Sequence, residues 1–543
     1  MDGGIKYPKW EIKEKKAGNI IEALLVNRGL KTKKDQADFL VPPDPLRVTL
    51  KEVGLKLTDI KKFTRILAET KKNQKKIIIY GDYDADGICA TAILWETLYS
   101  QGFDTLPYIP QRESEGYGLK AESVTLLKQK YHNLGLVITV DNGITANVEI
   151  KAIKKLGLQV VVIDHHQMGK KLPLTDLTIH TTSLCAGGIA WFVARELGYS
   201  KNLLELAAIA TIADQMPLLG VNRALVKLGL SALPQTKRVG LQALLHEAGI
   251  GDKALGTYEV NYLIAPRLNA TGRLAQGIDS LRLLCTRDTK RANQLAREIG
   301  QLNQKRQKVV EDSLLLVKKE LASTNKVVIV SGQYHEGVIG LLAGKLAEEF
   351  GRPAVVFSVG KEIAKASARS VTGVNIIAHI HQFDELLIGG GGHPMAAGFS
   401  LEVKHLDLFT QKFTDHLNRE VTDEMLGKKL KVDLILKPEL INKKLVDEIV
   451  KLEPFGMGNP TPVFLLENAL VTKVSAVGFG GHHLKLSVRI DEFPFEAIAF
   501  NFSEVKINDL LDQKVDLAVS LEENVWNGRT SLQLKVKDIC LKK

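Results

Sequence analysis

The sequence contains no apolar run long enough to cross a membrane. A transmembrane helix needs about 18 or more consecutive apolar residues, and no such stretch occurs in the 543 residues. The first 16 residues also lack the apolar core of a signal peptide. The four cysteines (Cys89, Cys185, Cys285 and Cys540) lie far apart and form no CxxC pair. These absences argue against a membrane protein, a zinc ribbon and a disulfide framework, and they favour a reducing cytoplasm.

The composition is that of a globular protein with several domains, since domains usually hold about 100–200 residues each. Apolar residues make up 45% and charged residues 25% of the chain, and the net charge is +11. The charge is uneven: residues 1–76 hold 19 Lys or Arg against 10 Asp or Glu, whereas residues 431–543 hold 15 against 16. A basic N-terminal part suits a polyanionic substrate, although a solvated lysine-rich helix surface would give the same count.

Three aspartates at alternate positions follow a short apolar strand. Residues 77–79 are isoleucines, a run typical of a buried strand, and Asp82, Asp84 and Asp86 come after it. In an extended chain this spacing places the three carboxylates on one side. Like charges so close repel strongly unless a cation lies between them. An acidic surface turn is the alternative, but the buried strand favours metal binding. Gly87 then permits a sharp turn into an expected helix.

Strand-like and helical stretches alternate from Lys76 onward. Strands are expected at 77–80, 105–109, 136–140, 159–163 and near 178–180, and helices at 121–131 and 146–156. This alternation predicts a doubly wound parallel sheet. Polar residues follow two further strands, as Asp141 and as the triplet Asp164-His165-His166. Ligands of open α/β sheets bind outside the carboxyl ends of the strands. The residues expected to converge there are Asp84, Asp86, Asp141 and His165.

A further acid, Asp214, ends an almost wholly apolar helical stretch at 203–216. An unpaired buried carboxylate is costly, so Asp214 needs a partner. A metal ion is one candidate. A helix N-cap or a salt bridge to Arg223 is the alternative.

The rest of the chain predicts three more parts. Residues 288–322 form a long charged amphipathic pattern that reads as a connecting helix. A second βα pattern starts at 327–330 and reaches the glycine run 389–392 and His393. On its own such a run is typical of a flexible loop, and nothing here has the Gly-Lys-Ser/Thr ending of a P-loop. From about 430, short β-rich runs and Asn527-Gly528 predict a small OB-like barrel. Its Trp526, His482 and His483 either contact nucleic acid or pack in the barrel.

The expected domain division places a basic helical segment at 1–76, with helices before the breaker 42–45 and again at 46–76. A parallel-sheet domain follows at 77–287, the connecting helix at 288–324, a smaller α/β domain at 325–425 and the barrel at 430–543.

Seven motifs occur in the order found in the DHH phosphoesterase family, and together they make the chain resemble that family. More narrowly, the set is similar to the RecJ group of single-strand-specific DNA exonucleases, as is the segment Leu452–Pro460 before the barrel. The seven motifs are Asp82–Gly87, Asp141–Gly143, Asp164–His166, Asp214, Arg267–Arg273, Ser367–Ser370 and Gly391–Gly398.

The resemblance implies a two-domain core with an OB-type addition, shaped like a ring or clamp around single-stranded DNA. It implies processive 5′-to-3′ hydrolysis of single-stranded DNA to nucleotides, in DNA repair and recombination, with two ions of Mn²⁺ or Mg²⁺. Two such ions, about 3.5–4 Å apart, generate the nucleophile and stabilise both oxygens of an in-line displacement. A monomer is expected, with a single-strand-binding protein or a helicase as partner and no membrane association.

The resemblance also implies roles for individual residues. The implied metal ligands are Asp84, Asp86, Asp141, His165 and Asp214, with Asp82 in or beside the coordination shell. Asp164 and His166 would orient ligands. Arg112, Ser367 and Arg369 resemble a 5′-phosphate pocket, and His393 resembles the donor to the scissile phosphate. Tyr117 is expected to stack on a terminal base, and Asn269 and Arg273 to contact substrate.

The chain departs from the family at Tyr80, where relatives often carry a metal-binding histidine. A phenol is a poorer ligand at neutral pH, so one ion would be held more loosely or would rely on Asp82. Two other functions stay open on sequence grounds: hydrolysis of short oligoribonucleotides or cyclic dinucleotides, and a non-catalytic replication scaffold. Enzymes of the first kind usually lack the barrel, and scaffolds lose ligands that this chain retains.

Overall fold

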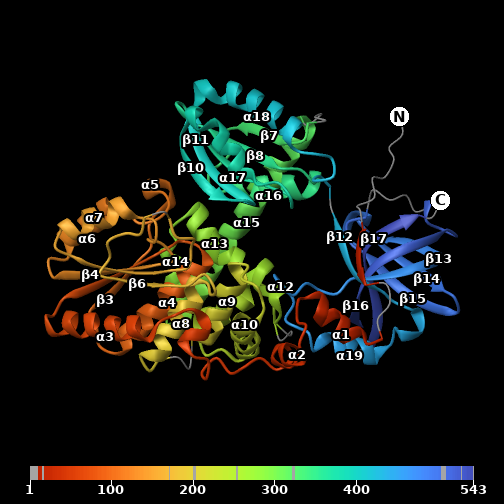
Figure 1. Cartoon of the computed structure of the whole chain (residues 1–543), viewed down its shortest axis with the longest axis horizontal. Coiled ribbons are helices and arrows are strands. Elements are labelled where there is room, and N and C mark those ends of the chain that lie inside the picture. Colours follow the sequence, from red (N-terminus) through yellow and green to blue (C-terminus); the bar gives the residue numbers. More distant parts are fainter. Residues whose placement is uncertain are drawn as a thin grey trace. The chain divides into compact units, whose positions relative to one another are not determined.

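The computed structural model describes residues 10–14, 18–169, 171–199, 203–251, 255–320, 325–427, 429–502, 509–526 and 529–541 (Figure 1). The chain divides into two compact units. One comprises residues 12–303 with 432–543, and the other comprises residues 304–431 with the first 11 residues. No helix in the described ranges has the length and hydropathy to span a bilayer.

The first sheet of the larger unit is parallel throughout, as the alternation of strands and helices predicts. Its spatial order is β3-β2-β4-β5-β6. The strands are β2 (Lys76–Gly81), β3 (Thr105–Tyr108), β4 (Leu134–Val140), β5 (Gln159–Asp164) and β6 (Leu177–His180). Because every connection returns to the same end, all five carboxyl ends lie along one edge of the sheet.

Helices cover both faces of this sheet (Figure 1). Ile77 and Ile79 of β2 pack in a core with α3 (Leu57–Lys72), α4 (Ala85–Ser100), α8 (Ala186–Glu196) and α9 (Leu204–Ala213). Ile78 and Tyr80 pack on the opposite face with α6 (Ala121–Lys130) and α7 (Asn147–Lys155). Burial on both faces explains why β2 is a continuous apolar run rather than an alternating one. The other helices here are α5 (Arg112–Glu115), α10 (Gly220–Ala232), α11 (Val239–Glu247), α12 (Thr257–Glu259), α13 (Ala265–Leu274) and α14 (Ile278–Cys285).

The N-terminal region is not purely helical, so this part of the prediction is wrong. Residues Trp10–Glu14 form strand β1, which lies next to β12 (Leu430–Ile435). The sequence Trp-Glu-Ile-Lys-Glu alternates apolar and polar residues, which is the period of a strand. The helices α1 (Ile20–Asn27) and α2 (Lys33–Leu40) follow, and both pack into the barrel core. Residues 1–9 lie outside the described residues.

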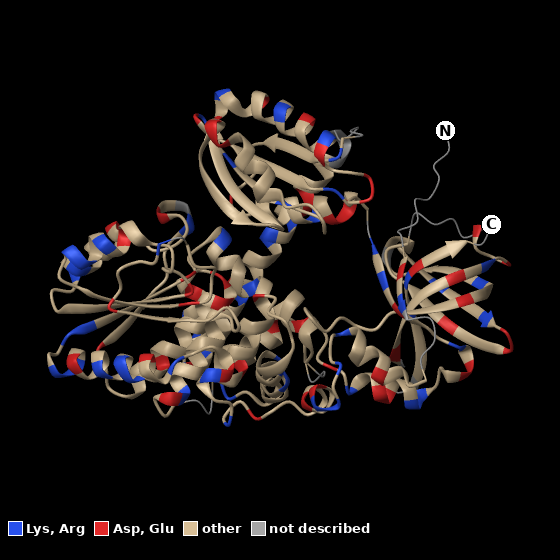
Figure 2. Ribbon diagram, in the orientation of Figure 1, with Lys and Arg blue, Asp and Glu red and all other residues tan. Residues whose placement is uncertain are grey.

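The C-terminal part is a closed barrel, in agreement with the predicted OB-like fold. Five strands run in the order β13-β14-β15-β17-β16, and β16 pairs with β13 to close the ring. They are β13 (Phe464–Val477), β14 (His483–Ile490), β15 (Phe493–Ala499), β16 (Lys514–Trp526) and β17 (Arg529–Leu541). Basic and acidic residues are interspersed over the strands (Figure 2). The His483 ring packs against Phe500, whereas the Trp526 side chain and Asn527-Gly528 lie outside the described residues.

The segment Leu452–Pro460 joins the barrel to the first part of the chain through buried hydrogen bonds. Asn459 is fully buried, and its side chain bonds to Leu452 O, Pro454 O and the Arg28 guanidinium. Arg223 of α10 is also fully buried and donates to the backbone carbonyls of Phe39, Pro454 and Glu453. Polar side chains placed this deep must be satisfied, and here they bond mainly to backbone. The segment Leu452–Pro460 therefore helps to attach the barrel to α10 and to the N-terminal helices.

The smaller unit contains a mixed sheet in the order β10-β11-β9-β8-β7. Its strands are β7 (Val328–Gly332), β8 (Ala354–Val359), β9 (Ile363–Arg369), β10 (Leu387–His393) and β11 (Ala396–Glu402). Helix α16 (Ile339–Phe350) and the end of α15 (Thr289–Glu320) pack on one face. Helices α17 (Ile376–Ile380) and α18 (Leu406–Glu420) pack on the other. As predicted, α15 is a single long helix. In the sequence it follows the parallel sheet of the larger unit and precedes the mixed sheet.

The glycine run is strand β10 at the edge of this sheet, so the flexible-loop interpretation is wrong. It pairs antiparallel with β11, and Gly390 lies opposite Phe399. A Cβ at Gly390 or Gly392 would collide with Phe399 or Ala396 on the neighbouring strand. The glycines therefore permit a close approach of two strands, a use of glycine inside sheets that composition alone does not distinguish from flexibility.

Candidate metal centre

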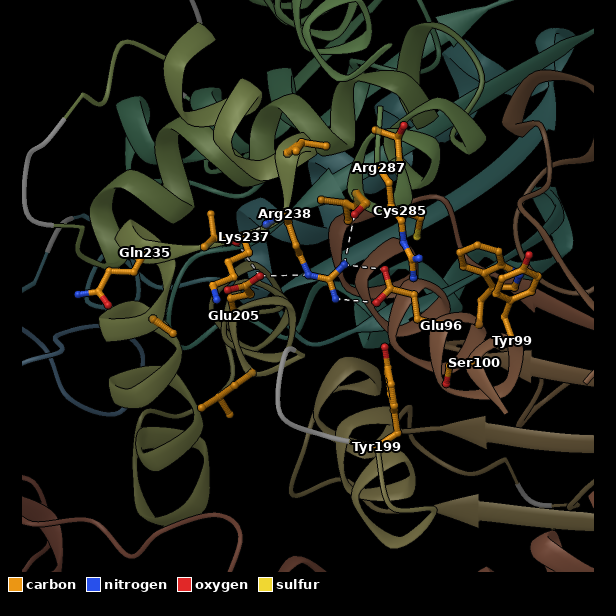
Figure 3. Close-up of a pocket in the computed structure, with 17 residues that line it drawn as sticks. Glu96, Tyr99, Ser100, Tyr199, Glu205, Gln235, Lys237, Arg238, Cys285 and Arg287 are labelled. Carbon is orange, nitrogen blue, oxygen red and sulfur yellow. Dashed lines mark hydrogen bonds and ion pairs between the residues drawn. The ribbon is translucent and has the colours of Figure 1, made fainter. Parts of the chain in front are cut away.

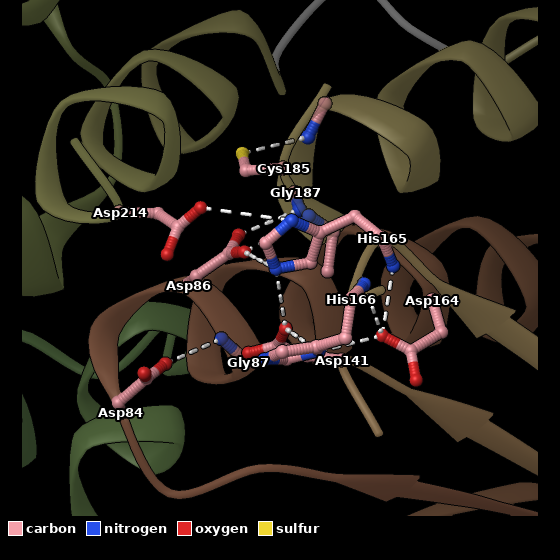
Figure 4. Close-up of polar contacts among 12 residues, drawn as sticks. Asp84, Asp86, Gly87, Asp141, Asp164, His165, His166, Cys185, Gly187 and Asp214 are labelled. Atoms are coloured by element: carbon pink, nitrogen blue, oxygen red, sulfur yellow. Dashed lines mark hydrogen bonds and ion pairs between the residues drawn. The ribbon is translucent and has the colours of Figure 1, made fainter. Parts of the chain in front are cut away.

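The three alternating aspartates lie where β2 gives way to α4. Figure 4 shows two of them, Asp84 and Asp86. Asp84 is the N-cap of α4, and its Oδ1 accepts the Gly87 N–H at 3.0 Å. Asp86 belongs to the first turn and is buried. Gly87 approaches Asp82 so closely that a Cβ would lie 2.7 Å from the Asp82 Cβ. The strand-to-helix turn thus packs three carboxylates into one small volume.

Two backbone amides of a second helix hold Asp86. The N–H groups of Ala186 and Gly187, in the first turn of α8, donate to its two oxygens at 2.9 and 2.7 Å. A helix N-terminus carries unpaired donors and a partial positive charge, so it favours a carboxylate. Sequence reasoning missed this contact. The signal for it is the run of small residues Ala186-Gly187-Gly188, which lets α8 approach closely.

Asp141 and His165 extend the cluster from β4 and β5. Asp141 adopts a left-handed backbone conformation with φ 64°, directly after β4. Its Oδ1 lies 3.2 Å from His165 Nε2, outside hydrogen-bond geometry. The Asn142 amide beside it donates to the carbonyls of Tyr80 and Val140 and ties the ends of β2 and β4 together. The motif Asp141–Gly143 contains Asn142, but its role in joining these two strand ends was not predicted.

Asp214 lies at the C-cap of α9, with its Oδ2 3.7 Å from His165 Nδ1. The alternative of a salt bridge to Arg223 is wrong, because Arg223 donates to backbone carbonyls instead. The N-cap alternative is also wrong, because Asp214 is at the other end of its helix.

Asp164 orients the two histidines. Its Oδ1 accepts the N–H groups of His165 (2.7 Å) and His166 (3.2 Å) and lies 2.8 Å from His166 Nδ1. Its Oδ2 accepts the Ile144 N–H. Burial opposes ionisation of Asp164, but the hydrogen bond and charge of His166 outweigh it and lower the Asp164 pKa. Asp164 is thus satisfied by protein donors.

Burial and mutual repulsion raise the pKa values of the neighbouring aspartates. Burial, and after it the charge of Asp84, raises the pKa of Asp86 to about 7. Burial and Asp86 raise the pKa of Asp214 to about 8. Asp82 and Asp141 are buried, and their pKa values are raised well above 3.8, first by burial and then by a neighbouring aspartate. Burial lowers the pKa of His165 to about 4, so its imidazole is neutral at pH 7 and available as a ligand.

The donor set fits divalent cations. Asp82 Oδ1 and Asp141 Oδ1 are buried and have no hydrogen-bond partner among the described residues, an arrangement that a cation would satisfy. Carboxylates with one or two imidazoles suit Mn²⁺, and carboxylates alone suit Mg²⁺. Three groups have ligand atoms within 4.8 Å of one another: Asp82-Asp84-Asp141, Asp86-His165-Asp214 and Asp141-His165-His166. The third group shares Asp141 with the first and His165 with the second, so all three groups lie next to one another.

Tyr80 does not face this cluster. Its side chain is buried on the α6 side of the sheet, with its ring centroid 5.1 Å from that of Tyr108 and its hydroxyl 3.4 Å from Gly118 O. The side chains of a strand alternate between faces, so Tyr80, two positions after Ile78, points into the same core as Ile78. The concern that Tyr80 weakens one ion site by replacing a ligand has no basis in this geometry.

The expected substrate residues of the larger unit surround Tyr83. The Arg112 guanidinium lies 5.5 Å from the Tyr83 ring centroid, and the Tyr117 ring packs edge-on at 6.2 Å. Tyr117 is 57% exposed, and its hydroxyl is 3.5 Å from His166 Nε2. Burial raises the pKa of Tyr83, and the charge of Arg273 opposes this shift. Asn269 instead accepts the Ala85 N–H at 2.7 Å and so supports the start of α4.

Ser367, Arg369 and His393 belong to the smaller unit. Arg369 Nη1 donates to Ser367 Oγ at 3.2 Å, and both side chains lie against Gly340 in the first turn of α16. Burial lowers the pKa of Arg369, and no carboxylate among the described residues opposes that shift. His393, at the end of β10, is exposed.

A cavity of about 760 Å³ lies elsewhere, at the C-terminal end of α4 (Figure 3). Arg238 crosses it, bound to Glu96 through two hydrogen bonds of 2.6 and 2.7 Å and to Glu205 at 3.1 Å. Both carboxylates that line this cavity, Glu96 and Glu205, are paired with Arg238. Among its described residues the cavity therefore has no unsatisfied acid comparable to Asp82 or Asp141.

Family models match three parts of the chain. The DHH family N-terminal domain matches residues 76–212, the DHHA1 domain residues 324–419 and the RecJ OB domain residues 432–538. The single-stranded-DNA-specific exonuclease RecJ of Bacillus subtilis is 34% identical over 537 residues, which cover 96% of this chain and 67% of that protein. The chain belongs to the RecJ family.

Further relatives extend this assignment. RecJ of Thermus thermophilus is 33% identical over 541 residues, covering 94% of this chain and 74% of that protein. The crystal structure of Thermus thermophilus RecJ in complex with Mn²⁺ superposes with a TM-score of 0.84 at 29% identity, covering 98% of this chain and 80% of that one. The RecJ fold predicted from the motif order is therefore confirmed over almost the whole chain.

Proposed function

We propose that this protein is a metal-dependent exonuclease that hydrolyses single-stranded DNA from the 5′ end, in DNA repair and recombination. The observation that carries the proposal is the strand-end cluster. Its Asp82 and Asp141 have buried carboxylate oxygens with no hydrogen-bond partner in the described part of the chain, and His165 lies beside them. Membership of the RecJ family supplies the substrate class. Two bound Mn²⁺ or Mg²⁺ ions would supply the activated nucleophile and neutralise charge on the phosphoryl oxygens.

The proposed roles follow the positions of the side chains. Asp164 fixes the backbone of both histidines and places a proton on His166 Nδ1. Burial opposes charging of His166, but Asp164 raises its pKa to about 9, so His166 is a cation at neutral pH and can attract a phosphate. The proposed metal ligands are Asp82, Asp84, Asp86, Asp141, His165 and Asp214. The proposed substrate contacts are Arg112, Tyr117, Asn269, Arg273, Ser367, Arg369 and His393.

The proposal extends to organisation and partners. We divide the chain at 1–76, 77–287, 288–324, 325–425 and 430–543, a division supported by the ranges of the three matching models. We further propose a monomeric cytoplasmic enzyme that works with a single-strand-binding protein or a helicase. A barrel with near-equal numbers of acidic and basic residues suits a protein partner at least as well as DNA.

Degradation of end-labelled DNA tests the function. A long single strand labelled at either end is incubated with the full chain and Mn²⁺ or Mg²⁺, beside the same sequence as a duplex and a short oligoribonucleotide. We expect the 5′ label to be released first, and only from the single strand. Release of the 3′ label first would refute the polarity, and cleavage of the oligoribonucleotide alone would refute the substrate class.

Metal binding is expected to stabilise the protein more strongly as the pH rises. The raised pKa values of Asp86 (about 7) and Asp214 (about 8) mean that the metal-free folded state holds protons which the unfolded state, with pKa 3.8, releases. These groups therefore stabilise the metal-free fold at low pH, and that stabilisation is lost as the pH rises through their folded pKa values. Cations need the ionised form. The increase in melting temperature caused by Mn²⁺ should thus grow from about pH 5 to about pH 8. An increase independent of pH would contradict the assignment, and D214N should flatten the profile.

Arg369→Gln is expected to reduce the preference for a 5′-phosphorylated end. The guanidinium is held by Ser367 without a carboxylate partner among the described residues, so it is free to pair with a phosphate. Loss of one charged donor typically costs about 10²-fold in rate. The measurement is kcat/KM on 5′-phosphorylated and 5′-hydroxyl strands. K365Q is the control, because Lys365 lies on the same strand but is exposed and paired with Glu336. An unchanged preference in R369Q would exclude this role.

A further inference from the structure

Two histidines of the smaller unit, outside the proposed active site, meet side chain to side chain. His379 lies on α17 and His416 on α18, and their Nδ1 and Nε2 atoms are 3.0 Å apart. The ring centroids are 5.1 Å apart with the planes at 64°. Phe383 packs edge-on against the His416 ring, with centroids 5.5 Å apart. Both histidines are partly exposed, so an ion from solvent has access to them.

The spacing of the two nitrogens matches a pair of ligands on one metal ion. Zinc–nitrogen bonds are about 2.0–2.1 Å long, so two imidazole nitrogens on a tetrahedral ion lie about 3.3 Å apart. The observed separation needs an adjustment of only a few tenths of an ångström. The two helices are also held in place independently of the histidines, because Ile376, Ile380, Phe413 and Leu417 are buried in the same core. The pair is therefore largely pre-formed.

A carboxylate is available to complete the ligand set. Glu420 follows His416 by one helical turn on α18, and side chains at i and i+4 lie on the same face. Burial lowers the pKa of His379, and the charge of Glu420 opposes this shift. The Glu420 side chain is exposed. The three ligand atoms do not all lie within 4.8 Å of one another, so the carboxylate would have to turn toward the pair to join it. Two imidazoles and one carboxylate, with the remaining position open to water, form a common divalent transition-metal set.

We propose that His379, His416 and Glu420 bind one Zn²⁺ ion at a site separate from the strand-end cluster. Imidazole nitrogen favours Zn²⁺ over Mg²⁺, so the two kinds of site select different ions. The ion would cross-link α17 to α18. Because α17 leads through residues 381–386 into β10, it would also stabilise the segment that carries His393.

Zinc binding to the full chain tests this site independently of the nuclease. Calorimetric titration with Zn²⁺ in saturating Mg²⁺ is compared between wild type, H379Q/H416Q and the control H405Q. His405 is the N-cap of α18, about three helical turns before His416. We expect wild type and H405Q to bind one equivalent more than the double variant. Zn²⁺ should also raise their melting temperature by an increment that the double variant lacks.

Two further measurements keep the outcome decisive. The single variant H379Q removes one ligand from the surface of α17 and should lose the same equivalent, even if the double variant folds poorly. Co²⁺ bound to wild type should give the visible absorption of a nitrogen-ligated site, and E420Q should weaken it. Equal stoichiometry in wild type and H379Q would overturn the proposal and leave an N–H···N hydrogen bond as the only role of the pair. This result would leave the nuclease assignment untouched.

Discussion

Replacing Asp141 by asparagine is expected to lower the rate of single-strand hydrolysis by about 10³-fold or more, while the protein remains folded. Charge stabilisation by bound metal ions contributes several kcal/mol to such reactions, and each 1.36 kcal/mol is tenfold in rate. Asp141 belongs to two of the three ligand groups and lies 3.2 Å from His165, so its loss affects both proposed ion positions.

The choice of asparagine follows from the backbone and the electrostatics. Asp141 has φ 64°, a conformation that asparagine tolerates and alanine disfavours, so D141N avoids the strain that D141A would add. The neutral amide also removes repulsion from Asp86, Asp84 and Asp82. The metal-free variant should therefore melt no lower than metal-free wild type.

A matched control separates the cluster from acids in general. Asp104 precedes β3, at the opposite edge of the same sheet, and pairs with Lys76. D104N should keep wild-type activity and metal content. Activity of D141N above about a tenth of wild type in metal-defined buffer would be inconsistent with metal-assisted hydrolysis at this cluster, since the loss would then be below 1.4 kcal/mol.

Parallel topology explains why most of the cluster could be placed from sequence. Asp84, Asp141 and His165 each follow a buried strand, and the carboxyl ends of parallel strands meet at one edge whatever the lengths of the connections. The structure brings these residues together, and it places Asp214 beside them although it comes from a helix end. The backbone donors on Asp86 could not be predicted in the same way, because they depend on how closely α8 packs rather than on residue type.

Side-chain direction and close packing account for the errors. Tyr80 precedes Asp82 by two positions, a spacing that shares one face within a strand. Because β2 ends at Gly81, the alternation does not continue to Asp82, and Tyr80 packs with Ile78 in the core on the α6 side. The glycines of β10 are needed because the neighbouring strand β11 leaves no room for a Cβ at Gly390 or Gly392. This requirement comes from the packing of β11, so the glycine run alone does not reveal it. Arg223 pairs with backbone carbonyls of the segment 451–454, which no local pattern links to α10.

Replacing Arg223 by methionine is expected to destabilise the attachment of the barrel by about 3 kcal/mol, because several buried carbonyls lose a charged donor. Arg223 is fully buried, its Nη2 lies 2.6 Å from Glu453 O, its Nε lies 2.8 Å from Phe39 O, and its guanidinium lies 3.8 Å from the Phe39 ring centroid. Methionine preserves much of the packing volume and removes the hydrogen bonds. Hydrogen exchange should accelerate at residues 36–40 and 451–460, and limited proteolysis should cleave there first.

The same variant distinguishes a structural role of Arg223 from a role at Asp214. Because Arg223 bonds to carbonyls and not to Asp214, R223M should keep the metal stoichiometry and the initial rate of wild type at low temperature. K227M is the matched control: Lys227 lies one turn further along α10 and donates a single hydrogen bond among the described residues, to Leu40 O at 3.2 Å, so we expect a cost of about 1 kcal/mol or less. R223K reaches fewer carbonyls and should fall between the two. A folded R223M protein that had lost metal would place Arg223 in the metal centre and contradict the geometry, whereas early proteolysis with intact metal binding would identify it as the residue that secures the barrel.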